Sequence, residues 1–302
     1  MSDLSVRIAG TTFKNPVLTA SGTFGYGSET ADLYDVNILG GLITKTITRL
    51  RRAGNPPPRL AETAAGMLNS IGLANVGIED FIKIKLPYLQ KLSTHIIVNI
   101  AGESHQDFLD LIAVLEDHGG ISGYELNLSC PNVASGLDFS INPLLTEKLI
   151  SDARKTTSRL LIPKLTPNVT DITVIARAAE DGGADAVSLI NTLIGMSVDI
   201  KTRKPRLGKI FGGLSGPAIK PVALAKVYSV CRAVKIPVIG IGGISCREDA
   251  LEFLLCGAVA VQLGTINFID PCAPVKVIDG LRGYLKENDI SSIRDVIGTV
   301  NA

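Results

Sequence analysis

The most regular feature of the sequence is an alternation between short apolar runs and longer amphipathic stretches. The runs are rich in β-branched residues, and polar or glycine-rich turns follow them. This alternation is typical of βα units, whose strands form a parallel sheet. Eight runs are predicted to be strands, at residues 16–20, 41–45, 96–100, 124–128, 161–165, 186–190, 236–241 and 258–263. Helices are predicted between them, including 104–118, 171–181 and 221–234.

Eight strand–helix repeats predict a (β/α)8 barrel of the TIM type, with residues 1–302 as a single domain. The run at 236–241 is apolar on both faces, as a strand between a barrel core and a helical layer must be. An open, doubly wound sheet is the alternative architecture. It is disfavoured because no G-x-G-x-x-G motif follows the first strand.

Three segments fall outside the eightfold pattern. Residues 4–13 predict an N-terminal β-hairpin that closes the bottom of the barrel. Residues 47–67 contain three consecutive prolines, which exclude a helix, so a long ordered loop is expected after strand two. Residues 193–213 form a second long insertion, rich in glycine, lysine and arginine, after strand six. Both insertions are expected at the carboxyl-terminal face, where long loops usually serve function.

Composition narrows the class of protein. A net charge of +1 and the absence of tryptophan argue against nucleic acid and anionic membranes as partners. The sequence shows no signal peptide and no apolar run long enough to span a membrane, so a cytoplasmic protein is expected. Five cysteines without a C-x-x-C pair and three histidines without ligand spacing predict neither disulfides nor a metal site. The basic stretch Lys201–Lys209 is interpreted as a solvated loop, with a partner contact or the guidance of an anionic substrate as alternatives.

Every predicted strand ends in a polar group or a glycine. Because the carboxyl ends of barrel strands meet at one rim, these groups are expected to share one site. Solvation of strand ends is the simpler explanation, but it accounts less well for two lysines and three asparagines. In chain order the groups are Ser21-Gly22, Lys45-Thr46, Asn99, Asn127, Lys164, Asn191-Thr192, Gly242-Gly243 and Gly264-Thr265.

The glycines after strands seven and eight indicate a phosphate site, because backbone N–H groups can approach phosphate oxygens there. Ser245 and Glu248 predict a capping box for the helix that follows. Tight turns without a ligand are the alternative. Lys164 lies in an apolar strand and is expected to be neutralised by an electron-rich flavin edge, and Lys45 by a substrate carboxylate. An ion pair with a core acid is the alternative for each lysine.

Cys130 is the cysteine with a candidate chemical role. It lies just past a strand end and opens a glycine-containing loop, 132–142, that could act as a lid over a base. The other four cysteines, Cys231, Cys246, Cys256 and Cys272, are expected to pack as small hydrophobic residues. Four asparagines are expected to converge on a ring with alternating N–H and C=O groups, namely Asn69, Asn127, Asn132 and Asn191.

The motifs together resemble the class 1 dihydroorotate dehydrogenases, from residue 15 to about residue 271. The resemblance implies FMN as cofactor and oxidation of dihydroorotate to orotate in pyrimidine synthesis. The motifs that carry it are A-S-G-T-F-G (20–25), K-T-I-T (45–48), G-N-P-P-P-R (54–59), G-M-L-N-S-I-G-L (66–73), N-L-S-C-P-N-V (127–133), K-L-T-P-N-V-T-D-I (164–172), I-N-T-L-I-G (190–195), G-G-L-S-G-P-A-I-K-P (212–221), G-I-G-G-I (240–244) and Q-L-G-T (262–265).

Taken position by position, the resemblance implies a role for individual residues. Cys130 would be the base that removes a proton from C5 of dihydroorotate, while hydride passes from C6 to N5 of FMN. The implied FMN contacts are Ser21, Lys45, Thr46, Asn99, Asn127, Lys164, Gly216, Gly242, Gly243, Gly264 and Thr265, with the backbone of Ile190. The implied substrate contacts are Lys45, Asn69, Ser70, Ile71, Gly72, Leu73, Asn127, Asn132, Asn191 and Thr192.

The length and the stretch N-S-I-G-L-A-N are most similar to the class 1B catalytic subunit. That class implies one FMN per chain and a homodimer, joined by an iron–sulfur flavoprotein subunit into a heterotetramer. FAD and a 2Fe–2S cluster are expected only on the partner, which passes electrons to NAD+, because this chain has neither a cysteine cluster nor a Rossmann fingerprint. Fumarate, the class 1A acceptor, is the alternative.

Two other functions remain open at this point. A dihydropyrimidine (dihydrouracil) dehydrogenase subunit shares the flavin barrel and the cysteine, but it typically has histidine where this chain has Asn132. A protein of another class, such as a non-redox barrel lyase or isomerase with a phosphorylated substrate, or an inert flavin binder, is the second alternative.

Overall fold

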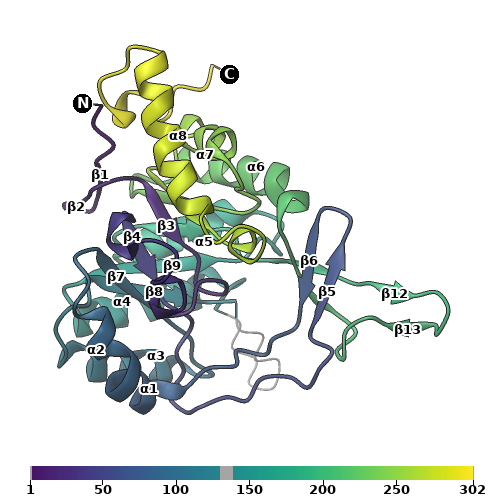
Figure 1. Cartoon of the computed structure of the whole chain (residues 1–302). Coiled ribbons are helices and arrows are strands. Elements are labelled where there is room, and N and C mark those ends of the chain that lie inside the picture. The colour runs from purple at the N-terminus through teal and green to yellow at the C-terminus, as the bar shows by residue number, and fades with distance from the viewer. Residues whose placement is uncertain (1, 130–138, 302) are drawn as a thin grey trace.

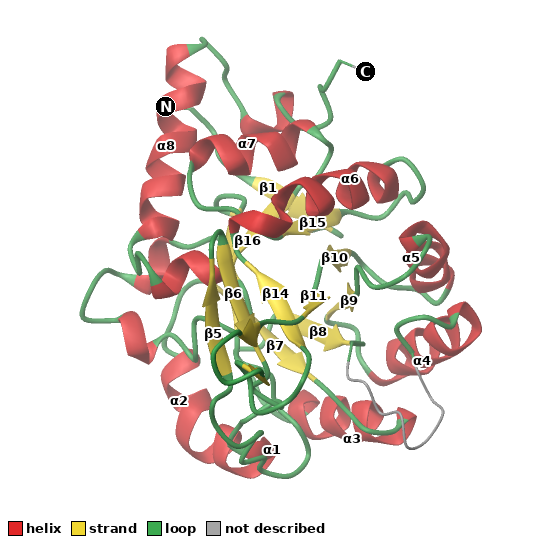
Figure 2. Ribbon diagram, turned by 90° about the vertical axis from the view of Figure 1, so that its right-hand side faces the viewer, coloured by secondary structure: helices red, strands yellow, loops and turns green. Residues whose placement is uncertain are grey.

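The computed structural model of the chain describes residues 2–129 and 139–301. At its centre eight parallel strands form a closed barrel, and helices surround it (Figures 1 and 2). The predicted (β/α)8 barrel is thus confirmed, and each strand begins and ends within two residues of its predicted bounds. The strands are β3 (Val17–Thr19), β4 (Gly41–Ile43), β7 (His95–Ile100), β8 (Gly123–Asn127), β9 (Leu160–Leu165), β10 (Val187–Leu189), β15 (Val238–Ile241) and β16 (Ala260–Leu263).

The helical layer follows the predicted pattern. The first helix after β4 is assembled from α1, a π-helical segment over Phe81–Lys85 and α2, which follow one another without a break. No helix among the described residues is long and apolar enough to cross a bilayer. The α-helices are α1 (Gly77–Asp80), α2 (Leu86–Leu89), α3 (His105–Glu116), α4 (Pro143–Thr156), α5 (Ile172–Asp181), α6 (Lys220–Cys231), α7 (Arg247–Leu255) and α8 (Ala273–Glu287).

Local side chains set where the helices begin and end. Ser104 precedes α3 and its hydroxyl accepts a hydrogen bond from the Asp107 N–H at 3.1 Å. Asp171 caps α5 in the same way, through the Thr173 N–H at 2.9 Å. At the other end of α5, Gly183 adopts a φ of 92°, which glycine reaches without a Cβ penalty. The predicted end of this helix at residue 181 is confirmed.

The predicted cap of α7 is wrong by one residue. The helix begins after Cys246, and Asp249 instead of Glu248 accepts the hydrogen bonds at its start. The Cys246 side chain is exposed, so the expectation that it packs as a small hydrophobic residue is also wrong. Cys246 is the N-cap residue, which flanks the first turn of the helix.

The N-terminal hairpin closes the lower end of the barrel, as predicted. It consists of β1 (Val6–Ile8) and β2 (Thr11–Phe13), which pair antiparallel. Phe13 is fully buried, and its ring centroid lies 4.4 Å from that of His95, the first residue of β7. His95 Nε2 also lies 2.9 Å from the Thr12 carbonyl oxygen. The hairpin therefore packs at the amino-terminal ends of the strands, opposite the rim where the site is expected.

The two long insertions contain more structure than the sequence indicates. Residues 47–67, predicted to be a loop, include strand β5 (Leu60–Thr63) and the start of β6 (Gly66–Asn69). The second insertion supplies β11 (Leu193–Gly195) and β14 (Gly212–Ser215), and all four strands form one antiparallel sheet in the order β11-β14-β6-β5. In Figure 2 this sheet lies across the barrel end. β6 pairs with β14, which lies far from it along the chain, so the local sequence pattern does not indicate either strand.

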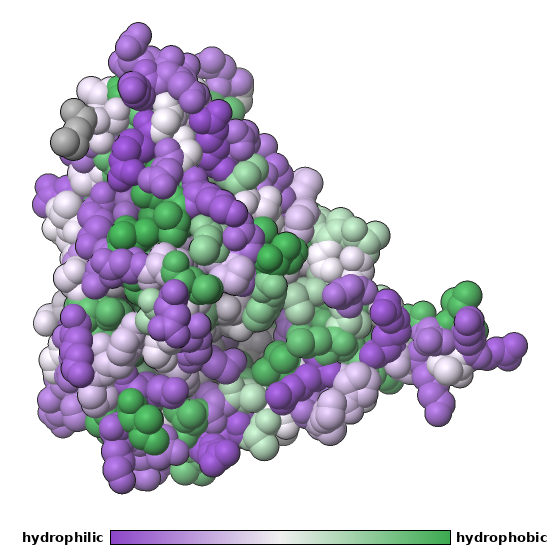
Figure 3. Space-filling model, in the orientation of Figure 1, coloured by the Kyte–Doolittle hydropathy of each residue, from purple (hydrophilic) through white to green (hydrophobic). Residues whose placement is uncertain are grey.

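Between β11 and β14 the chain extends into an arm. Its strands are β12 (Val198–Asp199) and β13 (Lys204–Pro205), and the arm stands clear of the body (Figures 1 and 3). Val198 and Ile200 are exposed on it. Lys201, Arg203 and Lys204 are exposed as well, in agreement with a solvated basic stretch.

Candidate active site

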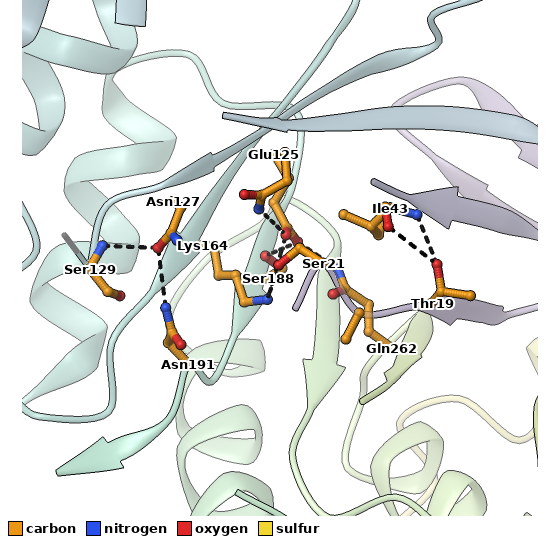
Figure 4. Close-up of polar contacts among 12 residues, drawn as sticks. Thr19, Ser21, Ile43, Glu125, Asn127, Ser129, Lys164, Ser188, Asn191 and Gln262 are labelled. Atoms are coloured by element: carbon orange, nitrogen blue, oxygen red, sulfur yellow. Dashed lines mark hydrogen bonds and ion pairs between the residues drawn. The ribbon is translucent and has the colours of Figure 1, made fainter. Parts of the chain in front are cut away.

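A buried polar network occupies the barrel interior below the rim. Glu125 on β8 is fully buried, and its carboxylate accepts hydrogen bonds from three strands. The donors are Asn99 Nδ2 at 2.6 Å, Ser188 Oγ at 2.9 Å and Gln262 Nε2 at 2.6 Å. Figure 4 shows Ser188 and Gln262 beside Glu125. The sequence analysis overlooked Glu125, Ser188 and Gln262, although a charged residue within the apolar strand β8 was a signal that could have identified the first.

Lys164 on β9 is the cation of this network. Its Nζ lies 3.5 Å from Glu125 Oε1 and 3.4 Å from Ser21 Oγ, and the side chain is buried. For Lys164 the structure therefore shows the second interpretation, an ion pair with an acid of the core. Ser21, which follows β3, shares the lysine, so three predicted strand ends (Ser21, Asn99 and Lys164) meet around one carboxylate.

The predicted convergence of asparagines is confirmed for one pair. Asn191 Nδ2 donates to Asn127 Oδ1 at 3.2 Å, and the Ser129 N–H donates to the same oxygen at 3.3 Å (Figure 4). The Thr192 N–H binds Asn191 Oδ1 at 2.8 Å, which fixes the orientation of that amide. Cys130 and Asn132 lie outside the described residues, and so does most of the predicted lid.

Lys45 is partly buried at the end of β4. Burial lowers the pKa of its ammonium, and the positive charge of Arg59 lowers it further. Arg59 belongs to the first insertion, where its Nη1 donates to the Ala53 carbonyl at 3.4 Å. Two cations that repel each other favour an anionic ligand between them, because its negative charge relieves the repulsion. Thr46, the next residue, is buried.

The stretch Asn69–Leu73 is anchored to both insertions. Asn69 Nδ2 donates to the Gly213 carbonyl in β14 at 3.3 Å, and the Ser70 N–H donates to the Arg59 carbonyl at 2.9 Å. The side chain of Thr192 packs directly against Gly213. Asn69 and Thr192 therefore meet the same residue of β14, which brings the stretch 69–73 to the end of β10.

Ile71, Gly72 and Leu73 form a strained turn in this stretch. Gly72 and Leu73 have φ values of 71° and 55°, and Leu73 is a rare non-glycine residue in that region. The Ile71 carbonyl accepts from the Asn55 N–H at 2.9 Å, and the Leu73 carbonyl accepts from Asn75 Nδ2 at 2.7 Å. These bonds hold the turn in place.

The predicted phosphate glycines gather at one point of the rim. Gly242 and Gly243 have φ values of 132° and 72°, and Gly216 has 94°. A Cβ on Gly243 would lie 2.9 Å from the Gly216 carbonyl oxygen, so these two backbones are in close contact. Thr265 Oγ1 donates to Ser215 Oγ at 2.8 Å, which joins the loop after β16 to the same place. Gly264 has more room, because a Cβ added there would meet only Ala20 Cβ, at 3.5 Å, among the described residues.

Ile190 is the last of the predicted FMN contacts. It is buried beside Gly242, and its N–H donates to the Ile241 carbonyl at 3.0 Å. Burial raises the pKa of the Cys231 thiol to about 12, as expected of a packed, unreactive cysteine. Among the described residues no cluster of three or more histidine, cysteine or acidic side chains is arranged to hold a metal ion.

Comparison with known proteins identifies the family. Residues 3–285 match the sequence profile of the family described as dihydroorotate dehydrogenase. A catalytic subunit of dihydroorotate dehydrogenase B (NAD(+)) from Thermodesulfovibrio yellowstonii is 51% identical over 300 residues, which cover 99% of both chains. A putative dihydroorotate dehydrogenase A (fumarate) from Solibacter usitatus is 50% identical over 298 residues, 98% of each chain.

A solved structure shares the fold. The DHODH of Eimeria tenella, crystallised with ferulenol, superimposes with a TM-score of 0.81 at 24% identity, over 98% of this chain and 88% of that one. The sequence match spans nearly the whole chain. This chain therefore belongs to the dihydroorotate dehydrogenase family.

Proposed function

We propose that this chain oxidises dihydroorotate to orotate with one bound FMN, as a step of pyrimidine synthesis. The observation that carries the proposal is the meeting, at one barrel rim, of a buried lysine, an amide pair and a glycine-lined turn, here Lys164, Asn127–Asn191 and Gly242–Gly243. The choice of dihydroorotate as the substrate rests on the names of relatives that are about 50% identical.

The residues present fit FMN. Gly216 and Gly243 let backbone segments pack closely at this glycine turn, since a Cβ on Gly216 would lie 2.8 Å from Gly66 Cα. The neighbouring Gly264 leaves open space, because a Cβ there would meet only Ala20 Cβ, at 3.5 Å, among the described residues. Such a turn suits a phosphate group. Asn99 Oδ1 is buried without a hydrogen-bond partner among the described residues, so it is available to a polar ring edge beside Lys164. When bound, FMN supplies N5 as the acceptor for the hydride from C6 of the substrate.

The proposed contacts follow from this arrangement. We assign FMN binding to Ser21, Lys45, Thr46, Asn99, Asn127, Lys164, Ile190, Gly216, Gly242, Gly243, Gly264 and Thr265. The amides of Asn127 and Asn191 suit the alternating N–H and C=O groups of the substrate ring. Lys45, beside Arg59, suits its carboxylate. The stretch 69–73, Asn132 and Thr192 complete the substrate set.

Cys130 is the proposed base. It lies three residues after Asn127, whose amide oxygen already holds the Ser129 N–H. Its thiolate would take the C5 proton of dihydroorotate, which the neighbouring carbonyl acidifies. Side chains around the ring would hold C5 toward this cysteine and keep water away from it.

The test of this function is reduction of the bound flavin without oxygen. The purified protein is expected to be yellow and to lose its flavin absorbance on addition of dihydroorotate, with little effect from dihydrouracil. The opposite preference would indicate a dihydropyrimidine dehydrogenase. A colourless protein that does not take up FMN would indicate a non-redox barrel, and a yellow protein that neither compound reduces would indicate an inert flavin binder.

For the electron acceptor we propose NAD+, reached through a second subunit. The relatives of this length include several that are named NAD(+)-linked catalytic subunits and one that is named fumarate-linked. The proposed assembly is a cytoplasmic heterotetramer, in which a homodimer of this chain binds iron–sulfur flavoprotein subunits that carry FAD and 2Fe–2S. Co-purification of such a flavoprotein with NAD+ reduction is the expected result, and turnover of the isolated chain with fumarate would contradict it.

A further inference from the structure

Glu125 is a buried carboxylate for which the proposed chemistry has no use. On β8 it points to the same face as Asn127, two residues nearer the rim, because strand side chains alternate. Asn127 pairs in register with Lys164, whereas Glu125 pairs with Ile162. The carboxylate therefore lies one layer deeper in the barrel than the lysine that it contacts.

The groups around the Glu125 carboxylate differ in charge. Asn99, Ser188 and Gln262 are neutral, and Lys164 is the cation within ion-pair distance at 3.5 Å. A charge placed in a barrel core is stable only with an opposite charge and full hydrogen bonding. The three neutral donors hold the carboxylate in place, and the carboxylate in turn restrains the ammonium group from below.

The ammonium group of Lys164 can donate one more hydrogen bond, toward the rim. An ammonium group has three donors, and among the described residues Ser21 and Glu125 are the partners of Nζ. The third donor is available to a ligand above the lysine. Because Glu125 offsets the charge of Lys164, the ligand meets a cation that is partly neutralised by an anion behind it.

We propose that Glu125 is a positioning residue that fixes Lys164 under the flavin and limits how strongly this lysine favours the reduced, more negative form of the cofactor. This inference rests on the proposed FMN site. It gives the buried carboxylate a definite function: without it, the full charge of Lys164 would act on the flavin, and the flavin would accept electrons more readily.

The test compares Glu125→Gln with Ser188→Ala, both as holoenzymes. Glutamine preserves the shape of glutamate but removes its charge. Its new N–H group can be accepted by Gln262 Oε1, which is buried without a partner among the described residues, once the Gln262 amide turns over. Ser188→Ala is the matched control, since it removes one hydrogen bond to Glu125 but leaves the ion pair intact.

The readout is the two-electron reduction equilibrium of bound flavin, measured against a reference dye without oxygen. We expect Glu125→Gln to favour reduction by about tenfold or more, equivalent to a midpoint about 30 mV more positive. Ser188→Ala should stay within about threefold of wild type. Equal midpoints in all three proteins, or equal shifts in both variants, would overturn the proposal. Failure of the wild type to bind FMN would instead overturn the proposed function.

Two further outcomes also decide the matter. Loss of FMN from folded Glu125→Gln, but not from Ser188→Ala, would support positioning, because only the first variant frees Lys164. If Glu125→Gln does not fold, the double variant Glu125→Gln/Lys164→Met removes both charges. Recovery of folding would support the coupling of the two side chains. If neither the single nor the double variant folds, Glu125 acts only in the stability of the barrel, and the inference is refuted.

Discussion

Asp249 holds the turn that follows the phosphate glycines, and its replacement by asparagine gives a quantitative test. One carboxylate oxygen accepts from the Ser245 N–H at 2.8 Å and from the Ser245 hydroxyl at 2.6 Å. The other binds Lys220 Nζ at 2.6 Å. Asp249→Asn keeps the size of the side chain but removes its charge, so Lys220 keeps only Glu252 as an acidic partner among the contacts of the described residues.

The magnitude follows from the pKa of Asp249. Burial acts to raise this pKa, but hydrogen bonds from Lys220 and Ser245 outweigh it and lower the pKa from 3.8 to about 2. One pKa unit corresponds to about 1.4 kcal/mol, so the ionised carboxylate contributes roughly 2 kcal/mol to the free energy of unfolding. Since the folded pKa is below the unfolded one, this contribution is complete above about pH 4 and disappears as the pH falls through about 2.

The assay is urea unfolding of both proteins from pH 7 down to pH 2. Asp249→Asn is expected to lose about 2 kcal/mol at pH 7, and the gap to wild type should close near pH 2. Glu248→Gln is the control, because Glu248 is an exposed neighbour on the same helix; its change should stay within about 0.5 kcal/mol. A gap that does not change with pH, or an equal loss in Glu248→Gln, would refute the assignment of the cap to Asp249.

Three further predictions concern the site. Cys130→Ser should keep FMN but slow flavin reduction by dihydroorotate about 10²–10⁴-fold in stopped-flow absorbance, and near-normal rates would exclude this base. Gly243→Ala should lose about 2–4 kcal/mol in urea unfolding and weaken FMN binding in fluorescence titration, because it adds left-handed strain and crowds Lys220 and Gly216. Lys45→Met should weaken orotate binding about 10–100-fold at neutral pH. Because burial and Arg59 lower the pKa of Lys45, orotate binding to wild type should weaken with rising pH earlier than for an ordinary lysine, and a flat profile would contradict this role.

Local sequence determined the barrel and much of the rim. Strands and helices depend on hydrophobic periodicity and on nearby caps, which short segments carry by themselves. The helix that Asp171 begins and Gly183 ends is an example. The gathering of Lys164, Asn127 and Asn191 at one rim also followed from strand order, because every parallel barrel strand ends on the same side.

Only the tertiary structure decided which groups are partners. The acid that pairs with Lys164 could have been any core carboxylate, and the choice of Glu125 depends on side chains from five strands meeting inside a closed barrel. The pairing of β6 with β14 joins segments that lie about 145 residues apart, so no local pattern indicates it. The cap of α7 uses Asp249 and not Glu248 because the helix begins one residue later than predicted, and Asp249 also binds Lys220 on another helix. Periodicity is a local property of a chain, whereas the partner of a buried charge is set by what the fold brings within a few ångströms of it.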